Sequence, residues 1–207
     1  MAQRGRLITI EGVDGAGKTT LARGLTEALE RRGIPVSLLR EPGGVEVSER
    51  LRSLVKDPAL TIGARAEALI YAAARAQLVE EAVQPRLASG AWIVLDRFVD
   101  SSLAYQGAGR KLGIEEVRAL NAFATGGLAP DRTLLLSLDP ADARTRAGDR
   151  AEGPDRLELA GNDFFARVHD AYALLSAAEP DRVRTLDAAQ PPDEVLACAL
   201  TALNDLL

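Results

Sequence analysis

The sequence contains few of the residues that build disulfides and metal centres. Its one cysteine, Cys198, excludes an internal disulfide and a cysteine-rich zinc site. Its one histidine, His169, argues against a histidine-rich metal centre. We expect Cys198 to be a small buried apolar side chain and His169 to be a surface or packing residue, and we assign neither a role.

Long apolar runs are also missing. No stretch of about 18 apolar residues exists, so we expect no transmembrane helix and no membrane partner. The N-terminal segment MAQRGRLITIEG lacks the apolar core and the small-residue cleavage site of a signal peptide. Together with the scarcity of cysteine, these absences favour the cytoplasm.

Positive charge is in deficit. Lysine and arginine number 25 against 30 acidic residues, and the net charge of −5 argues against a broad nucleic-acid-binding face. The length of 207 residues indicates one domain, or one domain with a mobile flap. Since an acidic protein that binds phosphates needs local positive charge, we look for arginines near glycines and strand ends.

Short apolar runs alternate with longer helical patterns along the chain. The strand candidates are residues 6–10, 36–39, 92–95, 133–138 and 183–186, and the helix candidates are residues 19–31, 67–88, 114–124, 163–177 and 191–207. This alternation predicts an α/β fold, with a parallel sheet covered by helices on both faces. The least regular stretch, residues 144–156, has no apolar period, and its composition leaves open a solvated loop or a lid.

The segment GVDGAGKT, which begins at Gly12, fits the pattern G-x-x-x-x-G-K-[ST] and lies between a strand pattern and a helix pattern. Gly12, Gly15 and Gly17 allow backbone N–H groups to approach phosphate oxygens without a side-chain clash. Lys18 suits the terminal phosphates, and Thr19 can ligate Mg²⁺. We therefore predict a loop that binds a nucleotide triphosphate, formed by Gly12, Val13, Asp14, Gly15, Ala16, Gly17, Lys18 and Thr19.

A second candidate is the apolar strand WIVLD, which ends in Asp96. The carboxyl end of a strand in an open α/β sheet is where ligands lie, and a carboxylate there can orient Mg²⁺ or its water. The alternative is an aspartate that pairs with its neighbour Arg97. With a phosphate loop in the same chain, we favour Thr19 and Asp96 as the metal ligands.

The phosphate loop does not identify the phosphoryl acceptor. The chain has no guanine-reading N-K-x-D motif, which argues against a regulatory GTPase, and a mechanical ATPase would usually be longer. A small phosphotransferase needs a second anionic site, for which the planar fork of arginine is suited. The candidates are Arg40, Arg52, Arg75 and Arg97, and for each the alternative is a surface ion pair of little energetic value.

Four segments together resemble the thymidylate kinase family: EGVDGAGKTT (11–20), REPGG (40–44), DRFVDSSLAYQG (96–107) and DRLE (155–158). Their order and spacing match over essentially the whole chain. The resemblance implies a five-stranded parallel sheet flanked by helices, of the P-loop nucleoside monophosphate kinase type. It also implies one domain over residues 1–207 with a mobile lid at about 144–158, and usually a homodimer. The implied reaction transfers the γ-phosphoryl group of ATP to dTMP with Mg²⁺, giving dTDP and ADP for dTTP synthesis.

The resemblance also implies roles for single residues. Asp14 would meet the sugar 3′-hydroxyl or its surroundings, and Arg52 and Arg97 would hold the acceptor phosphate. Tyr71 would stack on thymine and Arg75 would donate to a thymine carbonyl, and the four-residue spacing of these two places them on one helix face. The rest of the implied dTMP-binding set is Glu41, Ser101, Ser102, Tyr105 and Gln106. Tyr105 would also test sterically for a ribose 2′-hydroxyl. The alternatives are core aromatics for the tyrosines and helix caps for the serines.

The phosphate loop contains no arginine, although some thymidylate kinases have one there. The chain therefore resembles the subtype whose catalytic arginine lies on the lid. Arg150 is our first choice and Arg146 and Arg156 follow, while Arg144 is a candidate to flank adenine. The implied catalytic set is Lys18, Asp96, Arg97, Arg146 and Arg150.

Two other functions remain open at this point. One is a related kinase that takes dUMP or a deoxynucleoside, and the other is a regulatory P-loop ATPase. The strip of Tyr71, Arg75 and Gln106 distinguishes the first, because it would read thymine. ATP hydrolysis that dTMP does not affect would indicate the second.

Overall fold

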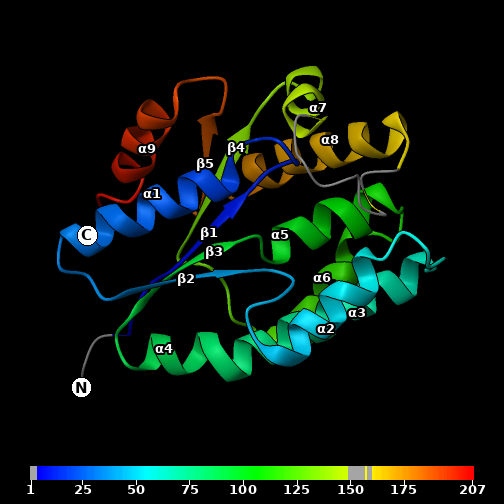
Figure 1. Ribbon diagram of the computed structural model, residues 1–207, viewed down its shortest axis with the longest axis horizontal. Helices are drawn as coiled ribbons and strands as arrows, with labels where there is room; N and C mark the ends of the chain where they lie inside the picture. Colours follow the sequence, from blue (N-terminus) through cyan, green and yellow to red (C-terminus); the bar gives the residue numbers. More distant parts are fainter. Residues whose placement is uncertain (1–3, 149–156, 158–159) are drawn as a thin grey trace.

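The computed structural model describes residues 4–148, 157 and 160–207. Their strands form a five-stranded parallel sheet in the order β2-β3-β1-β4-β5 (Figure 1). The strands are β1 (Leu7–Glu11), β2 (Val36–Arg40), β3 (Trp92–Asp96), β4 (Arg132–Ser137) and β5 (Val183–Asp187). The predicted sheet is therefore confirmed, and each predicted strand end lies within one residue of the observed one.

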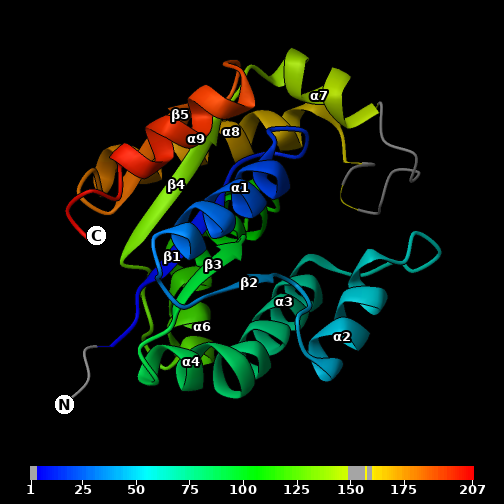
Figure 2. The same ribbon diagram turned by 60° about the vertical axis from the view of Figure 1, so that its left-hand side comes forward.

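Helices cover both faces of the sheet, as Figure 2 shows. They are α1 (Lys18–Arg31), α2 (Glu46–Lys56), α3 (Ala64–Leu78), α4 (Gln84–Ala88), α5 (Val99–Ser102), α6 (Ile114–Thr125), α7 (Pro140–Gly148), α8 (Asn162–Ala178) and α9 (Pro192–Thr201), with two π-helical segments, η1 (Val79–Val83) and η2 (Leu103–Gly109). The predicted helix over residues 67–88 is the continuous run α3–η1–α4. None of the described helices is long and apolar enough to cross a membrane.

Three sequence-based expectations need correction. The stretch predicted to be irregular from residue 144 is helical as far as Gly148, because α7 begins at Pro140 and the Asp139 carboxylate accepts a hydrogen bond from the backbone N–H of Ala141 at its start. Cys198 is exposed, since the buried face of α9 carries Val195 and Ala199 instead. The last helix ends at Thr201 rather than continuing through residue 207.

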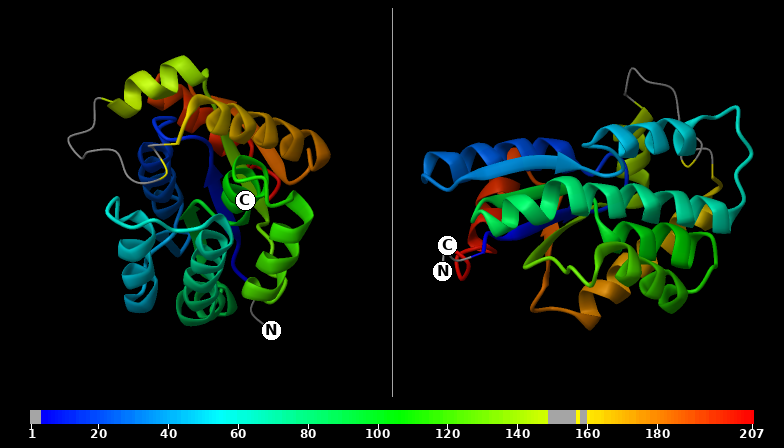
Figure 3. Two further views of the ribbon diagram at one scale, coloured as in Figure 1. Left: turned by 90° about the vertical axis from the view of Figure 1, so that its right-hand side faces the viewer. Right: turned by 90° about the horizontal axis from the view of Figure 1, so that it is seen from below.

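The alternation of side chains along the strands supplies apolar residues to a hydrophobic core on each face of the sheet. Ile8 and Ile10 of β1 join the core under α1 and α9, whereas Leu7 joins the core under α3, η1 and α4. Helix α2 lies beside α3 (Figure 3). Because the sheet is parallel, the carboxyl ends of all its strands lie at one edge, where the phosphate loop, the REPGG segment and Asp96 meet.

Candidate active site

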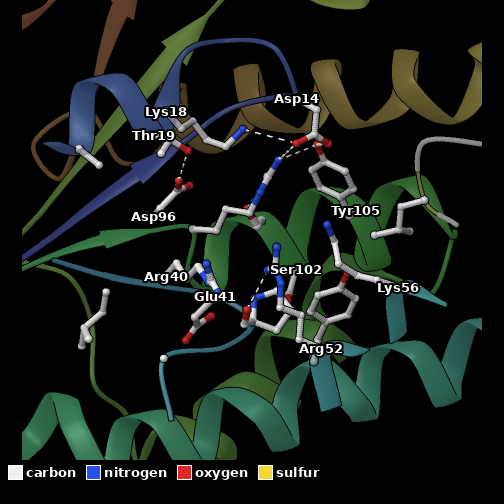
Figure 4. A pocket seen from close by; sticks show the side chains of 18 of the residues that line it. Asp14, Lys18, Thr19, Arg40, Glu41, Arg52, Lys56, Asp96, Ser102 and Tyr105 are labelled. Carbon is white, nitrogen blue, oxygen red and sulfur yellow. Dashed lines mark hydrogen bonds and ion pairs between the residues drawn. The ribbon is translucent and has the colours of Figure 1, made fainter. Parts of the chain in front are cut away.

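A cavity of about 850 Å³ opens at this edge of the sheet. Figure 4 shows Lys18, Thr19 and Asp96 in the upper part of the view and Glu41, Arg52 and Ser102 in the lower part. The predicted site residues that line the cavity are Asp14, Gly15, Gly17, Lys18, Thr19, Glu41, Arg52, Tyr71, Arg75, Asp96, Arg97, Ser101, Ser102, Tyr105, Gln106 and Arg146. Arg150 and Arg156 lie outside the described residues. Side chains from distant parts of the chain thus converge on one concave space.

The phosphate loop adopts a backbone that only glycine tolerates well at three of its positions, Gly12, Gly15 and Gly17. Gly12 has a φ of 136°, and a Cβ atom there would lie 2.6 Å from the carbonyl oxygen of Leu136. Gly17 has a φ of 91° and directly precedes α1. The loop therefore leads into the N-terminus of α1, where the helix dipole favours an anion.

Lys18 folds back over this loop. Its Nζ donates to the carbonyl oxygen of Val13 at 2.8 Å and lies 3.7 Å from the Asp14 carboxylate. Burial and the positive charge of Arg97 lower the pKa of Lys18 to about 8. A bound phosphate would favour the charged ammonium, which makes Lys18 a cation suited to the phosphates of a nucleotide.

Arg97 joins the phosphate loop to the rest of the cavity. Its guanidinium donates to the Asp14 carboxylate at 2.6 Å, to the carbonyl oxygen of Gly12 at 3.1 Å and to the Ser101 hydroxyl at 3.0 Å. The Arg97 backbone has a φ of 71°, which is uncommon for a residue other than glycine. Such a conformation persists only where neighbouring contacts hold it, and it turns the side chain from the end of β3 toward the phosphate loop.

Asp96 and Thr19 form the candidate metal site. The Thr19 hydroxyl donates to Asp96 Oδ2 at 2.9 Å, so two hard oxygen ligands lie side by side next to the phosphate loop. Over the described residues, no three His, Cys, Asp or Glu side chains form a metal-binding group. This donor set fits Mg²⁺, which is commonly held by one or two protein oxygens together with substrate phosphates.

Glu41 and Arg75 form a buried ion pair at the opposite wall. Arg75 also donates to the Phe98 carbonyl, the Ser102 hydroxyl and Asn121, so its guanidinium already has four acceptors. Burial raises the pKa of Glu41, although the charge of Arg75 opposes this. Glu41 Oε1 is buried without a hydrogen-bond partner among the described groups, which leaves one acceptor available beside the cavity.

Two more predicted residues are placed by contacts that the sequence did not reveal. Arg52 of α2 donates to the carbonyl oxygen of Pro42 at 2.8 Å, which anchors it beside the REPGG segment. Tyr105 packs its ring against Phe164 and Tyr172 in the core, while its hydroxyl lies 3.4 Å from Arg97. Tyr105 is therefore both a core aromatic and a cavity residue.

The sequence interpretation missed Glu11, which is fully buried at the end of β1. Glu11 accepts hydrogen bonds from the Phe98 N–H at 2.7 Å, the Ser101 hydroxyl at 2.5 Å and the Tyr172 hydroxyl at 3.0 Å. These bonds hold Phe98, which directly follows Arg97, and Ser101. The available signal was a carboxylate at the end of an apolar strand, the same signal that identified Asp96.

We predict that Glu11 makes stability depend on pH. Burial, reinforced by the nearby Asp100 carboxylate, raises the pKa of Glu11 from 4.5 to about 7. Between these values the folded protein binds more protons than the unfolded chain, so the free energy of unfolding falls as pH rises. We expect the free energy of unfolding, measured with urea at pH 5, 6 and 7, to fall between pH 5 and pH 7 by about 1–2 kcal/mol more for the wild type than for Glu11→Gln. Parallel pH curves for the two proteins would contradict this assignment.

Comparison with known proteins gives one family. The thymidylate kinase family model matches residues 10–198. A thymidylate kinase of Lactobacillus delbrueckii subsp. bulgaricus is 47% identical over 202 residues, covering 95% of this chain and 94% of that protein. A thymidylate kinase of Deinococcus radiodurans is 46% identical, with 98% of each chain covered. The solved structure of thymidylate kinase from Ehrlichia chaffeensis superposes with a TM-score of 0.79 at 27% identity, over 97% of this chain and 99% of that one.

Proposed function

The chain belongs to the thymidylate kinase family, and from that premise we propose which of its residues perform the reaction. The enzyme transfers a phosphoryl group from ATP to dTMP, giving dTDP and ADP. The observation that carries the residue assignment is the 2.6 Å contact between Arg97 and Asp14, which ties the acceptor side of the cavity to the phosphate loop. Phosphates bound on the two sides would then be close and aligned for in-line transfer.

The donor side consists of the loop from Gly12 to Thr19 and the start of α1. Backbone N–H groups of the loop and the ammonium of Lys18 bind the β- and γ-phosphates of ATP. Thr19 and Asp96 hold Mg²⁺, which when bound neutralises charge on the phosphate oxygens. This chain contributes positioning and fixed positive charge, since phosphoryl transfer requires little covalent participation by the protein.

The acceptor side holds dTMP by its phosphate and its base. Arg52 and Arg97 bind the dTMP phosphate through charge-assisted hydrogen bonds. Asp14 would face the sugar, and we assign the steric test for a ribose 2′-hydroxyl to Tyr105, whose hydroxyl lies 3.5 Å from the Asp14 carboxylate. The remaining acceptor residues are Glu41, Tyr71, Arg75, Ser101, Ser102 and Gln106.

The base is bound by Tyr71, which stacks on thymine, together with Arg75. Four of the five N–H groups of Arg75 already have acceptors, so at most one N–H group is left for a thymine carbonyl. The hydroxyl of Ser102 accepts from Arg75 at 2.9 Å and keeps its own hydrogen for donation, so the two residues act as one donor.

We propose that an arginine of the lid, at about residues 144–158, stabilises the negative charge of the transition state. The lid and the rest of the chain belong to a single domain in this proposal. Arg150 is preferred over Arg146, because Arg146 donates to the carbonyl oxygen of Ala188 at 2.9 Å. Ala188 directly follows β5 and belongs to residues 186–195, which the family resemblance implies lie near adenine. Arg146 would therefore be held near adenine rather than at the transferred group. Closure of the lid would exclude water and limit wasteful hydrolysis of ATP.

We also propose that the enzyme acts in the cytoplasm as a homodimer. Phe123 of α6 is 89% exposed and Leu69 of α3 is 57% exposed, on two helices that pack against each other. Large exposed apolar side chains on adjacent helices favour a protein interface. Sedimentation equilibrium tests this, and a monomer at micromolar concentration would contradict it.

The acceptor assignment is tested by coupled ADP release with dTMP, dUMP, dCMP, dGMP and thymidine. We expect the highest kcat/KM with dTMP. Thymidine should be at least about 10²-fold poorer, because it has no phosphate for Arg52 and Arg97 to hold. Equal rates with thymidine would contradict the anionic site. ADP release at the same rate without any acceptor would indicate an ATPase.

A further inference from the structure

Two rows of side chains face each other at the end of the cavity proposed for the base. Glu67, Tyr71 and Arg75 follow one another at four-residue steps along one face of α3. The opposite row comes from α5 and η2, where Ser102 accepts from Arg75 at 2.9 Å and Gln106 donates to Glu67 at 2.9 Å. Tyr71 and Gln106 line the cavity, and Gln106 separates Glu67 from it.

Glu67 determines which end of the Gln106 amide faces the cavity. Glu67 is fully buried and also accepts from Arg110 at 3.2 and 3.0 Å. A carboxylate paired with a guanidinium can only accept hydrogen bonds, so the NH₂ group of Gln106 must face it. The reversed amide would bring two oxygens within 2.9 Å of each other. The amide oxygen of Gln106 is therefore directed away from Glu67, and the contacts found over residues 4–148, 157 and 160–207 give it no donor.

We propose that Glu67 is a specificity-determining residue, which turns the Gln106 oxygen toward the base as a fixed hydrogen-bond acceptor. This inference rests on the proposed placement of dTMP beside Tyr71 and Gln106. Thymine presents an N3–H donor next to its O4 acceptor, which complements the Gln106 oxygen and the donors of Arg75 and Ser102. Cytosine presents a bare N3 and an amino group at the same positions, so both contacts would be mismatched. Uracil has the same edge as thymine, and Glu67 does not distinguish the two.

The test is Glu67→Gln, assayed with dTMP and dCMP. A glutamine at position 67 can present either end of its amide, so Gln106 loses its fixed orientation. We expect the ratio of kcat/KM for dTMP over dCMP to fall by at least about tenfold, because a polar site rejects an analogue only while its groups stay correctly paired. The matched control is Glu81→Gln, since exposed Glu81 accepts from Gln77 at 2.9 Å in an equivalent pair outside the cavity. Its ratio should equal that of the wild type.

The exchanged variant, Glu67→Gln with Gln106→Glu, separates orientation from simple structural damage. Its carboxylate at position 106 presents an acceptor to the base in either orientation, and the amide at position 67 donates to it. We expect the ratio to return to within about threefold of the wild-type value, because the fixed acceptor is restored.

Two outcomes would overturn the role proposed for Glu67, and a third would overturn the proposed placement of the base. If kcat/KM of Glu67→Gln falls by the same factor for dTMP and for dCMP, Glu67 has only a structural role. An exchanged variant that folds without regaining the preference would also overturn the inference, including in the case where Glu67→Gln itself does not fold. A wild-type enzyme without preference for dTMP over dCMP would instead overturn the proposed placement of the base.

Discussion

Arg97→Ala is expected to lower kcat/KM for dTMP by at least about 10²–10³-fold, the cost of removing one fixed electrostatic contact to the reacting phosphates. The substitution removes the guanidinium that contacts Asp14 at 2.6 Å, Gly12 at 3.1 Å and Ser101 at 3.0 Å. The acceptor phosphate then loses one of its two cations and its alignment with the phosphate loop. Steady-state kinetics with dTMP and ATP, each varied, measure the effect.

Two companion variants sharpen the Arg97 experiment. Arg97→Lys keeps the charge without the planar fork, so we expect it to recover only part of the loss. Arg50→Ala is the matched control, because Arg50 makes an exposed ion pair with Glu46 on α2 and should leave the kinetics unchanged. A loss of less than tenfold in Arg97→Ala would remove Arg97 from the acceptor-phosphate site.

Lys18→Met is expected to lower kcat by at least about 10²–10³-fold, the cost of removing one fixed electrostatic contact to a transition state. Methionine keeps much of the apolar length of the side chain but removes the ammonium that lies 2.8 Å from the Val13 carbonyl oxygen. The developing charge on the transferred group and on the leaving phosphate then lacks its nearest fixed cation. Single-turnover kinetics at saturating ATP and dTMP separate this loss from weaker ATP binding.

The control for Lys18 is Lys56→Met, because Lys56 also lines the cavity but lies at the end of α2, away from the phosphate loop. Lys56→Met should retain most of kcat, since no fixed contact to the ATP phosphates is removed. A Lys18→Met enzyme with a near-normal single-turnover rate would assign the ATP phosphates to another cation. The melting temperature of each variant, measured by calorimetry, verifies that the fold is intact.

Local sequence patterns were sufficient to predict the strands of the sheet, but they did not predict every helix. Apolar runs in strands are short and continuous, and those of β1, β3 and β4 are almost entirely buried, so the strand ends were predicted to within one residue. Helix α2 was missed because only Ser48 and Val55 are buried along it, which gives no extended apolar period. Segment η2 was missed because LAYQGAG contains two glycines. Packing overrides that low helical propensity, since a Cβ atom at Gly109 would lie 2.6 Å from the Phe164 ring.

The candidate site shows the same division. The phosphate loop is a contiguous motif whose residue types follow from its chemistry, so it could be read directly. Glu67 could not be identified as a site residue, because a carboxylate within a helical pattern normally indicates a solvated surface. Glu11 ends an apolar strand as Asp96 does, but the sequence does not show which groups it contacts. Glu11 is buried only because Phe98, Ser101 and Tyr172 supply donors to it, and Tyr172 lies 161 residues away along the chain.

By itself, the sequence determined the parallel α/β sheet, the phosphate loop and the family resemblance, since each depends on residues that are close together or on a fixed order of short segments. The tertiary structure decided which arginines share the cavity, how Arg97 turns back to Asp14 and which end of the Gln106 amide faces Glu67. The reason is that a hydrogen bond has a direction and needs a partner, and folding brings these partners together from distant parts of the chain.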